Sequence, residues 1–278
     1  MIRLLLPITV AAAGMLSAQT SPLTAEAIMQ RVGANQDRAE DLRRQYLYSE
    51  HVVIVSRKTN GKVMQEEASD YLVAPDPKGS SKKLARVAGK YWQKHDYVNY
   101  SGVGTPNDGS LDGDLVSDLR DDLVNERRSK DGIATCLFPL TSKEQEKYRF
   151  HLLGEETLNG RKVYRVGFRP GNSDVPWKGE AIIDAEEFQP VTVFTKLSRR
   201  VPFWVRTALG TDLPDLGFSV TYQRLGDGVW FPASFGTEFR LHAVFFINRN
   251  ITISMRNSDF EKTHVDSLIH YDQASLKR

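Results

Sequence analysis

One segment of the chain has a spacing that could support metal binding, and its set of ligands is incomplete. The segment 108–119 partly matches a calcium-binding loop, with oxygen-bearing side chains at its first, third and fifth positions and Gly113 at its sixth. The twelfth position should supply a bidentate glutamate but is Leu119, so two of the expected ligand oxygens are missing. A turn followed by a helix N-terminus explains Asp112 and Asp114 without a metal, because carboxylates stabilise that end of a helix. We therefore predict no metal site.

The patterns of nucleophilic and phosphate-binding enzymes are also incomplete. The six histidines have no zinc-site spacing, and G-x-S-x-G is absent. Ser80 and Lys83 fit S-x-x-K, but the partner motifs of that enzyme class are not found together. We predict a protein that is not an enzyme and that needs no cofactor. A hydrolase with a dispersed site stays open as an alternative, and a titratable pair within hydrogen-bond reach in the main cleft would mark it.

The segment 197–210 combines aromatic and basic residues and is the most unusual part of the chain. It contains Arg199, Arg200, Phe203, Trp204 and Arg206. Aromatic side chains beside arginines suit a surface that contacts acidic lipid headgroups or an apolar partner, so we expect membrane or partner docking here. The alternative is a helix that covers the sheet while its arginines reach water.

Composition and charge limit the class of protein. The chain has 278 residues, and its 37 Lys and Arg against 35 Asp and Glu give a net charge of +2, which excludes the strongly basic surface typical of nucleic-acid binders. Residues 1–18 have the basic start, apolar stretch and small terminal residues of a signal peptide, so we expect an exported protein. A single cysteine, Cys136, cannot form an internal disulfide, and its apolar neighbours favour a buried thiol. No linker divides residues 19–278, which we expect to form one domain.

The remaining sequence predicts two helices and many strands. Apolar spacing favours helices over 21–44 and 114–130, while runs rich in Val, Ile, Thr and aromatic residues predict the strands. Asn60-Gly61 and Asn159-Gly160 have the turn residues of two hairpins. The expected strands are 46–57, 63–74, 148–155, 162–168, 179–184, 190–197, 217–225, 229–240, 241–248 and 251–259.

Two of these strands alternate most clearly between apolar and polar residues, which indicates a sheet with one buried face. The apolar side of the pattern consists of Phe218, Val220, Tyr222, Phe239, Leu241 and Phe245. Short turns between consecutive strands favour an antiparallel arrangement. The predicted fold is mainly β (α+β): a curled antiparallel half-barrel sheet whose concave face is covered by helices. The six residues would line a hydrophobic cavity, or alternatively form a fully packed core.

The order of these parts resembles the LolA-like superfamily of periplasmic lipoprotein carriers. The signal peptide, N-terminal helix and Asn60-Gly61 hairpin are followed by three short motifs: NGRKVYRV at 159–166, GEAIID at 179–184 and GVWFP at 228–232. The resemblance implies a periplasmic half-barrel with a cavity for acyl chains and no catalysis, so its partners would be lipids or acylated proteins and a membrane surface. Insertions near 84–147 and 198–216 depart from the carriers. The alternative is an envelope sensor or protein-interaction module with the same fold.

Overall fold

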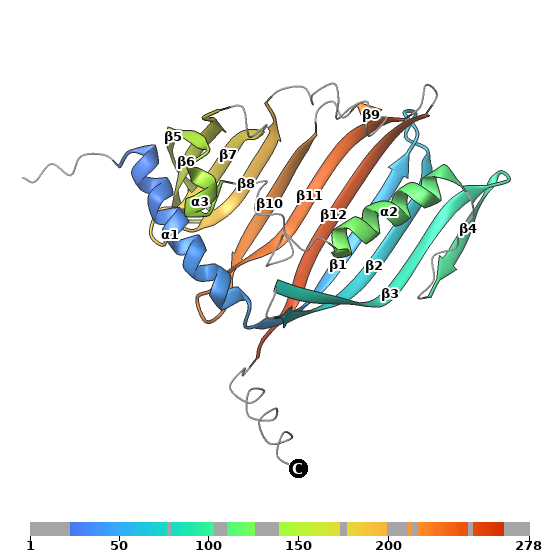
Figure 1. Ribbon diagram of the computed structural model, residues 1–278, viewed down its shortest axis with the longest axis horizontal. Helices are drawn as coiled ribbons and strands as arrows, with labels where there is room; N and C mark the ends of the chain where they lie inside the picture. Colours follow the sequence, from blue (N-terminus) through green and yellow to red (C-terminus); the bar gives the residue numbers. More distant parts are fainter. Residues whose placement is uncertain are drawn as a thin grey trace, which may run out of the picture.

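The computed structural model describes residues 23–76, 79–102, 110–125, 139–172, 177–198, 211–212, 216–243 and 247–263. They form three helices and twelve strands, and the strands make up one long curled sheet (Figure 1). The helices are α1 (Ala25–Arg43), α2 (Leu111–Asn125) and α3 (Ser142–Gln145). The strands are β1 (Tyr46–Arg57), β2 (Val63–Asp76), β3 (Gly79–Gln93), β4 (Asp96–Ser101), β5 (Tyr148–Leu158), β6 (Arg161–Pro170), β7 (Trp177–Asp184), β8 (Pro190–Leu197), β9 (Thr211–Asp212), β10 (Gly217–Arg224), β11 (Trp230–Ala243) and β12 (Ile247–Lys262).

The sheet is antiparallel throughout and does not close into a barrel. Its strand order is β4-β3-β2-β1-β12-β11-β10-β8-β7-β6-β5, and the short β9 pairs with the end of β11. The first and last long strands, β1 and β12, pair with each other in the middle of this order. The chain therefore builds one half of the sheet from β1 to β4 and the other half from β5 to β12. The predicted fold class, a curled antiparallel half-barrel with helices on its concave face, is confirmed.

Hairpin turns set the register of both halves. Asn159 and Gly160 have φ of 52° and 80°, the left-handed conformation that a tight two-residue hairpin requires, and the turn joins β5 to β6. Gly61, with φ of 85°, has the same role between β1 and β2. Lys94 and His95 adopt positive φ between β3 and β4, although lysine rarely does so and the pair is not one of the usual hairpin-turn dipeptides. That hairpin therefore lacks the sequence signal that predicted the other two.

The two longer helices pack against the concave face in different places. In Figure 1, α1 crosses the β5–β8 side of the sheet and α2 lies over β1, β2 and β12. α1 contacts β5 and the short α3, whereas α2 contacts β1 and β2. The hydroxyl oxygen of Thr24 accepts a hydrogen bond from the Ala27 N–H at the start of α1, and Ser110 accepts one from Gly113 at the start of α2. Both predicted helices are therefore present, over 25–43 and 111–125.

The strand predictions need two corrections. The expected separate strand over 241–248 is wrong, because β11 continues through Leu241 to Ala243 and β12 begins at Ile247. Part of the expected insertion over 84–147 is regular sheet, since it contributes most of β3 and all of β4. The other predicted strands coincide with strands of the sheet.

Candidate functional site

The apolar residues predicted to line the cavity share the concave face. Val220 on β10 lies opposite Phe235 on β11 and Val193 on β8, and Phe235 in turn lies opposite Met255 on β12. All four side chains are buried in one hydrophobic cluster with α1. Five predicted residues belong to or pack against this cluster: Phe218, Val220, Tyr222, Phe239 and Leu241. The sixth, Phe245, lies outside the described residues.

These five residues divide into two groups by exposure. Val220 is fully buried and Tyr222 is 9% exposed, so both are part of the packed core. Phe218, Phe239 and Leu241 are only partly buried although they point to the same face. The Phe218 ring meets Trp177 edge-on with centroids 5.2 Å apart and lies 5.5 Å from Phe235. Aromatic pairs at such distances stabilise one another beyond their buried area, which holds this apolar surface in place.

Under α2 the concave face is polar, which the sequence did not predict. The Glu67 side chain on β2 is 1% exposed and accepts hydrogen bonds from Arg120 of α2 at 3.1 Å and from the Tyr100 hydroxyl at 2.9 Å. Burial, followed by the neighbouring Glu67 charge, raises the pKa of Tyr100. Gly89 lies beneath the Tyr100 ring, where a Cβ atom would come within 2.4 Å of it. A glycine at this position is therefore what lets Tyr100 reach Glu67.

A second ion pair fixes the start of α2. Arg249 of β12 donates two hydrogen bonds to the Asp112 carboxylate, at 2.6 and 2.8 Å, and Ser56 of β1 donates a third at 2.6 Å. Asp112 therefore serves to attach the helix to the sheet, while Ser110 supplies the cap. The first two positions of the candidate calcium loop, Asp108 and Gly109, lie outside the described residues, and the positions from Leu111 to Leu119 belong to α2. Within the described part of the chain, no group of three or more His, Cys, Asp or Glu side chains could hold a metal ion.

The same half of the sheet contains a buried lysine–carboxylate pair. Lys82 Nζ of β3 lies 2.7 Å from Glu50 Oε1 of β1, and the two side chains are 5% and 1% exposed. Burial raises the pKa of the Glu50 carboxyl, and the nearby ammonium group opposes this shift without cancelling it. Among the described residues, none donates a hydrogen bond to the second oxygen of Glu50. Removing either member of the pair would therefore leave an uncompensated buried charge, which strongly destabilises a fold.

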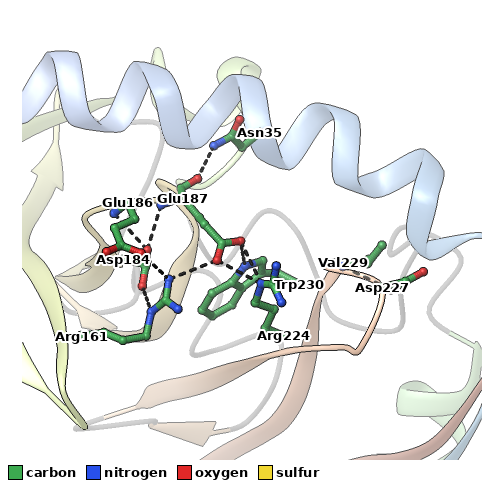
Figure 2. A network of polar contacts seen from close by, with 9 residues as sticks. All are labelled: Asn35, Arg161, Asp184, Glu186, Glu187, Arg224, Asp227, Val229 and Trp230. Carbon is green, nitrogen blue, oxygen red and sulfur yellow. Dashed lines mark hydrogen bonds and ion pairs between the residues drawn. The ribbon is translucent and has the colours of Figure 1, made fainter.

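On the opposite side of the molecule, a polar network ties α1 to the turns below it (Figure 2). Asp184, at the end of β7, accepts hydrogen bonds from the backbone N–H groups of Glu186 and Glu187 at 3.0 and 2.8 Å. Its other oxygen lies 2.5 Å from Arg161 Nε. Burial would raise the pKa of Asp184, but these hydrogen bonds outweigh it and lower the pKa. Asn35 of α1 donates to the backbone carbonyls of Glu187 and Phe188 at 2.8 and 3.1 Å.

The network extends to the turn between β10 and β11. Trp230 Nε1 donates to Glu187 at 2.9 Å, and Arg224 Nε donates to the same carboxylate oxygen at 3.1 Å. Burial tends to raise the pKa of Glu187, yet the hydrogen bond from Trp230 and the pair with Arg224 lower it. Asp227, in the same turn, accepts a hydrogen bond from the Tyr46 hydroxyl, which lowers the pKa of that carboxyl.

The three sequence motifs at 159–166, 179–184 and 228–232 meet in this network. Each supplies one of its members: Arg161, Asp184 and Trp230. All three side chains hold turns together beneath α1, and their partners are protein groups. The motifs that carried the resemblance therefore stabilise the turns to which Asn35 of α1 donates its hydrogen bonds.

A titratable pair typical of hydrolases occurs on the outer face. His51 Nδ1 lies 2.6 Å from Asp70, with exposures of 51% and 44%. No described hydroxyl or thiol group hydrogen-bonds to the His51 ring, so a nucleophile of the kind that such a pair activates is not assembled by the described residues.

Among the described residues, none of the helices combines the length and the apolar character needed to cross a bilayer.

The remaining predicted residues lie outside the described part of the chain. They are the signal peptide over 1–18, Cys136 and the docking residues Arg199, Arg200, Phe203, Trp204 and Arg206.

Comparison with solved structures finds similar folds. A DUF1329 family protein from Desulfovibrio piger matches with a TM-score of 0.40 and 13% identity, covering 91% of this chain and 99% of that one. A putative outer membrane lipoprotein-sorting protein domain from Vibrio parahaemolyticus matches with a TM-score of 0.40 and 15% identity, over 91% and 100% of the two chains. A LolA superfamily protein from Nitrosomonas europaea gives 0.37 and 13%, over 91% and 100%.

Neither the family models nor the curated proteins contain a match to this sequence.

Proposed function

We propose that this chain is an exported, non-enzymatic protein that binds the acyl chains of lipids or lipoproteins on the concave face of its sheet. The leader-like sequence of residues 1–18 supports export to the periplasm. The ligand site would comprise Phe218, Val220, Tyr222, Phe239, Leu241 and Phe245.

The observation that carries the proposal is the partial exposure of Phe218, Phe239 and Leu241. They sit on β10 and β11, between the strands that α1 contacts and those that α2 contacts, and they pack against the buried cluster. Apolar side chains held at the edge of a core gain about 25 cal/mol for each Å² that a ligand covers. An acyl chain would supply this area without any polar contact.

The roles within the proposed site differ. Val220 and Tyr222 would form its floor, because they are already buried by the protein. Phe218, Phe239 and Leu241 would touch the ligand directly. Substitutions at the floor should therefore affect folding, whereas substitutions of the three partly exposed residues should affect binding more than stability.

Binding of a fluorescent polyene fatty acid, cis-parinaric acid, tests this division. Phe218→Ser should weaken binding about tenfold, since it removes ~1.5 kcal/mol or more of apolar contact. The matched variant Phe194→Ser changes an equally large residue that is 49% exposed on the outer face, and it should bind as the wild type does. Equal binding by both variants would contradict the proposal.

A second variant covers the case in which Phe218→Ser unfolds. Leu241→Trp keeps the surface apolar but fills space, so it should reduce the amount of fatty acid bound while leaving the melting temperature close to that of the wild type. Undiminished uptake by a folded Leu241→Trp protein would place the ligand elsewhere.

The proposed docking segment needs its own test. Phe203→Ser combined with Trp204→Ser should reduce binding to lipid vesicles without lowering the melting temperature. A large loss of stability would instead make this pair part of the core. Failure to bind fatty acid together with capture of a specific protein would favour the alternative, an envelope sensor or interaction module.

A further inference from the structure

The outer face of the sheet, opposite the helices, carries a row of exposed cations across β5 to β8. Arg149 lies directly opposite Arg169, and Lys178 lies directly opposite Lys196. The pairing of Phe168 with Gly179 places Arg169 and Lys178 next to each other in the same row. Four like charges thus follow one another across four neighbouring strands. We call them the basic row.

None of these four residues forms an ion pair within the described part of the chain. Like charges directly opposite one another destabilise a sheet. Exposed charges on the other half of the outer face are arranged differently, since His51 pairs with Asp70 and Lys90 with Glu66. The repulsion within the basic row is therefore a local feature that an anion would relieve.

A depression of about 540 Å³ lies against this row. It is lined by His151, Arg169, Lys178, Glu180, Phe194 and Lys196, together with backbone of the same strands. Its one carboxylate, Glu180, is already bound by Arg165, whose Nε and Nη2 donate at 2.5 and 3.1 Å. Phe194, which is 49% exposed, forms an apolar edge. The depression therefore combines uncompensated positive charge with one exposed aromatic ring.

We propose that the basic row and its depression bind an acidic protein segment in an extended conformation. Strands lie about 4.8 Å apart, so four of them span roughly 14 Å, the length of about four extended residues. A chain of that length can enter a depression, place carboxylates beside the cations and lay an apolar side chain on Phe194. A flat bilayer would meet the rim of the depression instead of its floor. This surface is separate from the acyl site and does not depend on it.

The test uses a fluorescein-labelled peptide that contains four glutamates and one leucine, with a glutamine version as its neutral counterpart. The variant Arg169→Gln/Lys178→Gln/Lys196→Gln should weaken binding of the acidic peptide about tenfold, because each exposed ion pair contributes modestly. The control Lys58→Gln/Lys83→Gln/Arg86→Gln removes the same charge from exposed positions on the other half and should bind normally. The glutamine peptide should not bind to any of the three proteins.

Thermal unfolding gives a second readout that does not require the peptide. Removing three members of a like-charged row should leave the melting temperature unchanged or raise it, whereas a structural role for these residues would lower it. The proposal is overturned if the two triple variants lose binding equally. It is also overturned if both peptides bind alike, or if only phosphatidylglycerol vesicles or inorganic phosphate bind to the row.

Discussion

The two helices that cover the concave face are held by different forces. α1 buries Ile28, Met29 and Val32 completely or almost completely, and its polar contacts join it to the turn after β7, to the start of β11 and to α3. Among the α2 side chains whose burial the structure describes (111–121), Val116 is the one apolar side chain that is completely buried, and the helix is attached through Asp112 and Arg120. Burial of apolar area tolerates small movements, whereas hydrogen-bonded ion pairs require fixed positions.

This contrast bears on where a ligand can enter. The apolar surface that stays partly exposed lies on β10 and β11, at the border between the two halves. An acyl chain there would bury apolar surface and would stay away from the buried carboxylates of Glu50 and Glu67. Separating either carboxylate from its partner would lower the stability of the fold. In the proposed site, the polar half would therefore limit where a ligand lies, and the apolar surface would supply its affinity.

The largest effect is expected from Lys82→Met. The substitution leaves Glu50 buried without its counter-charge, which should cost about 3–5 kcal/mol of unfolding free energy. The matched variant Lys90→Met breaks a pair whose side chains are 38% and 40% exposed and should cost ~1 kcal/mol or less. Urea unfolding measures both. Similar losses of unfolding free energy in the two variants would mean that the buried Lys82–Glu50 pair stabilises this half no more than an exposed pair does.

A smaller loss is expected on the α1 side from Asp184→Ala. The variant loses two backbone hydrogen bonds and the contact with Arg161, which should cost about 2–3 kcal/mol. Glu186→Ala changes a neighbouring carboxylate that is 80% exposed and should lie within ~0.5 kcal/mol of the wild type. If Glu186→Ala lost as much unfolding free energy as Asp184→Ala, the turn would be stabilised by negative charge in its vicinity and not by the specific contacts of Asp184.

The two carboxylates should also respond to pH in opposite directions. Asp184 has a folded-state pKa below its ordinary value of 3.8, so its contribution to stability is complete above 3.8 and is lost as the pH falls through the lower folded-state pKa. Glu50 has a pKa above its ordinary value of 4.5, so its contribution is complete below that value and is lost as the pH rises through the folded-state pKa. Acidification should therefore narrow the stability gap between the wild type and Asp184→Asn.

The corresponding variant on the other side is Glu50→Gln. Its stability relative to the wild type should improve as the pH rises, because the wild type alone must keep a buried carboxylate charged. Denaturant titrations at several pH values between about 3 and 7 measure both slopes. If the unfolding free energies of the two variants, each relative to the wild type, changed with pH in the same direction, the predicted contrast between the two halves would be wrong.

The smallest effect is expected at the start of α2. Ser110 accepts a hydrogen bond from the Gly113 N–H at 3.0 Å, so Ser110→Ala should lower the unfolding free energy by about 1 kcal/mol. Ser110→Gly should cost only a few tenths of a kcal/mol, since glycine is also accepted at this position. If Ser110→Ala had no effect, the ion pair of Asp112 would be the sole anchor of this end.

The sequence predicts the hairpins better than the faces of the strands. Asn159-Gly160 predicts its turn because both residues are typical of a tight hairpin with positive φ. Lys94-His95 adopts positive φ without being such a turn dipeptide, so the sequence does not predict the hairpin of β3 and β4. In β2, hydrophobicity gives the wrong face: Glu67 is buried, whereas Leu72 is 48% exposed. The ion pair that inverts this pattern joins residues 53 positions apart, and periodicity cannot foresee such a partner.

For the candidate site, the sequence predicts which face the residues share but does not predict how exposed each of them is. Alternation placed Phe218, Val220 and Tyr222 on one face, which the strand pairing reproduces. Their different exposures depend on neighbours from β7, β11 and the helices, and these neighbours come from distant parts of the chain.

The most direct test of acyl-chain binding is to purify the protein from the exported fraction, extract it with organic solvent and identify the released molecules by mass spectrometry. We expect about one acyl-bearing lipid per folded protein, and less in the Phe218→Ser variant than in Phe194→Ser. Recovery of no lipid from protein that is folded and exported would contradict acyl-chain binding.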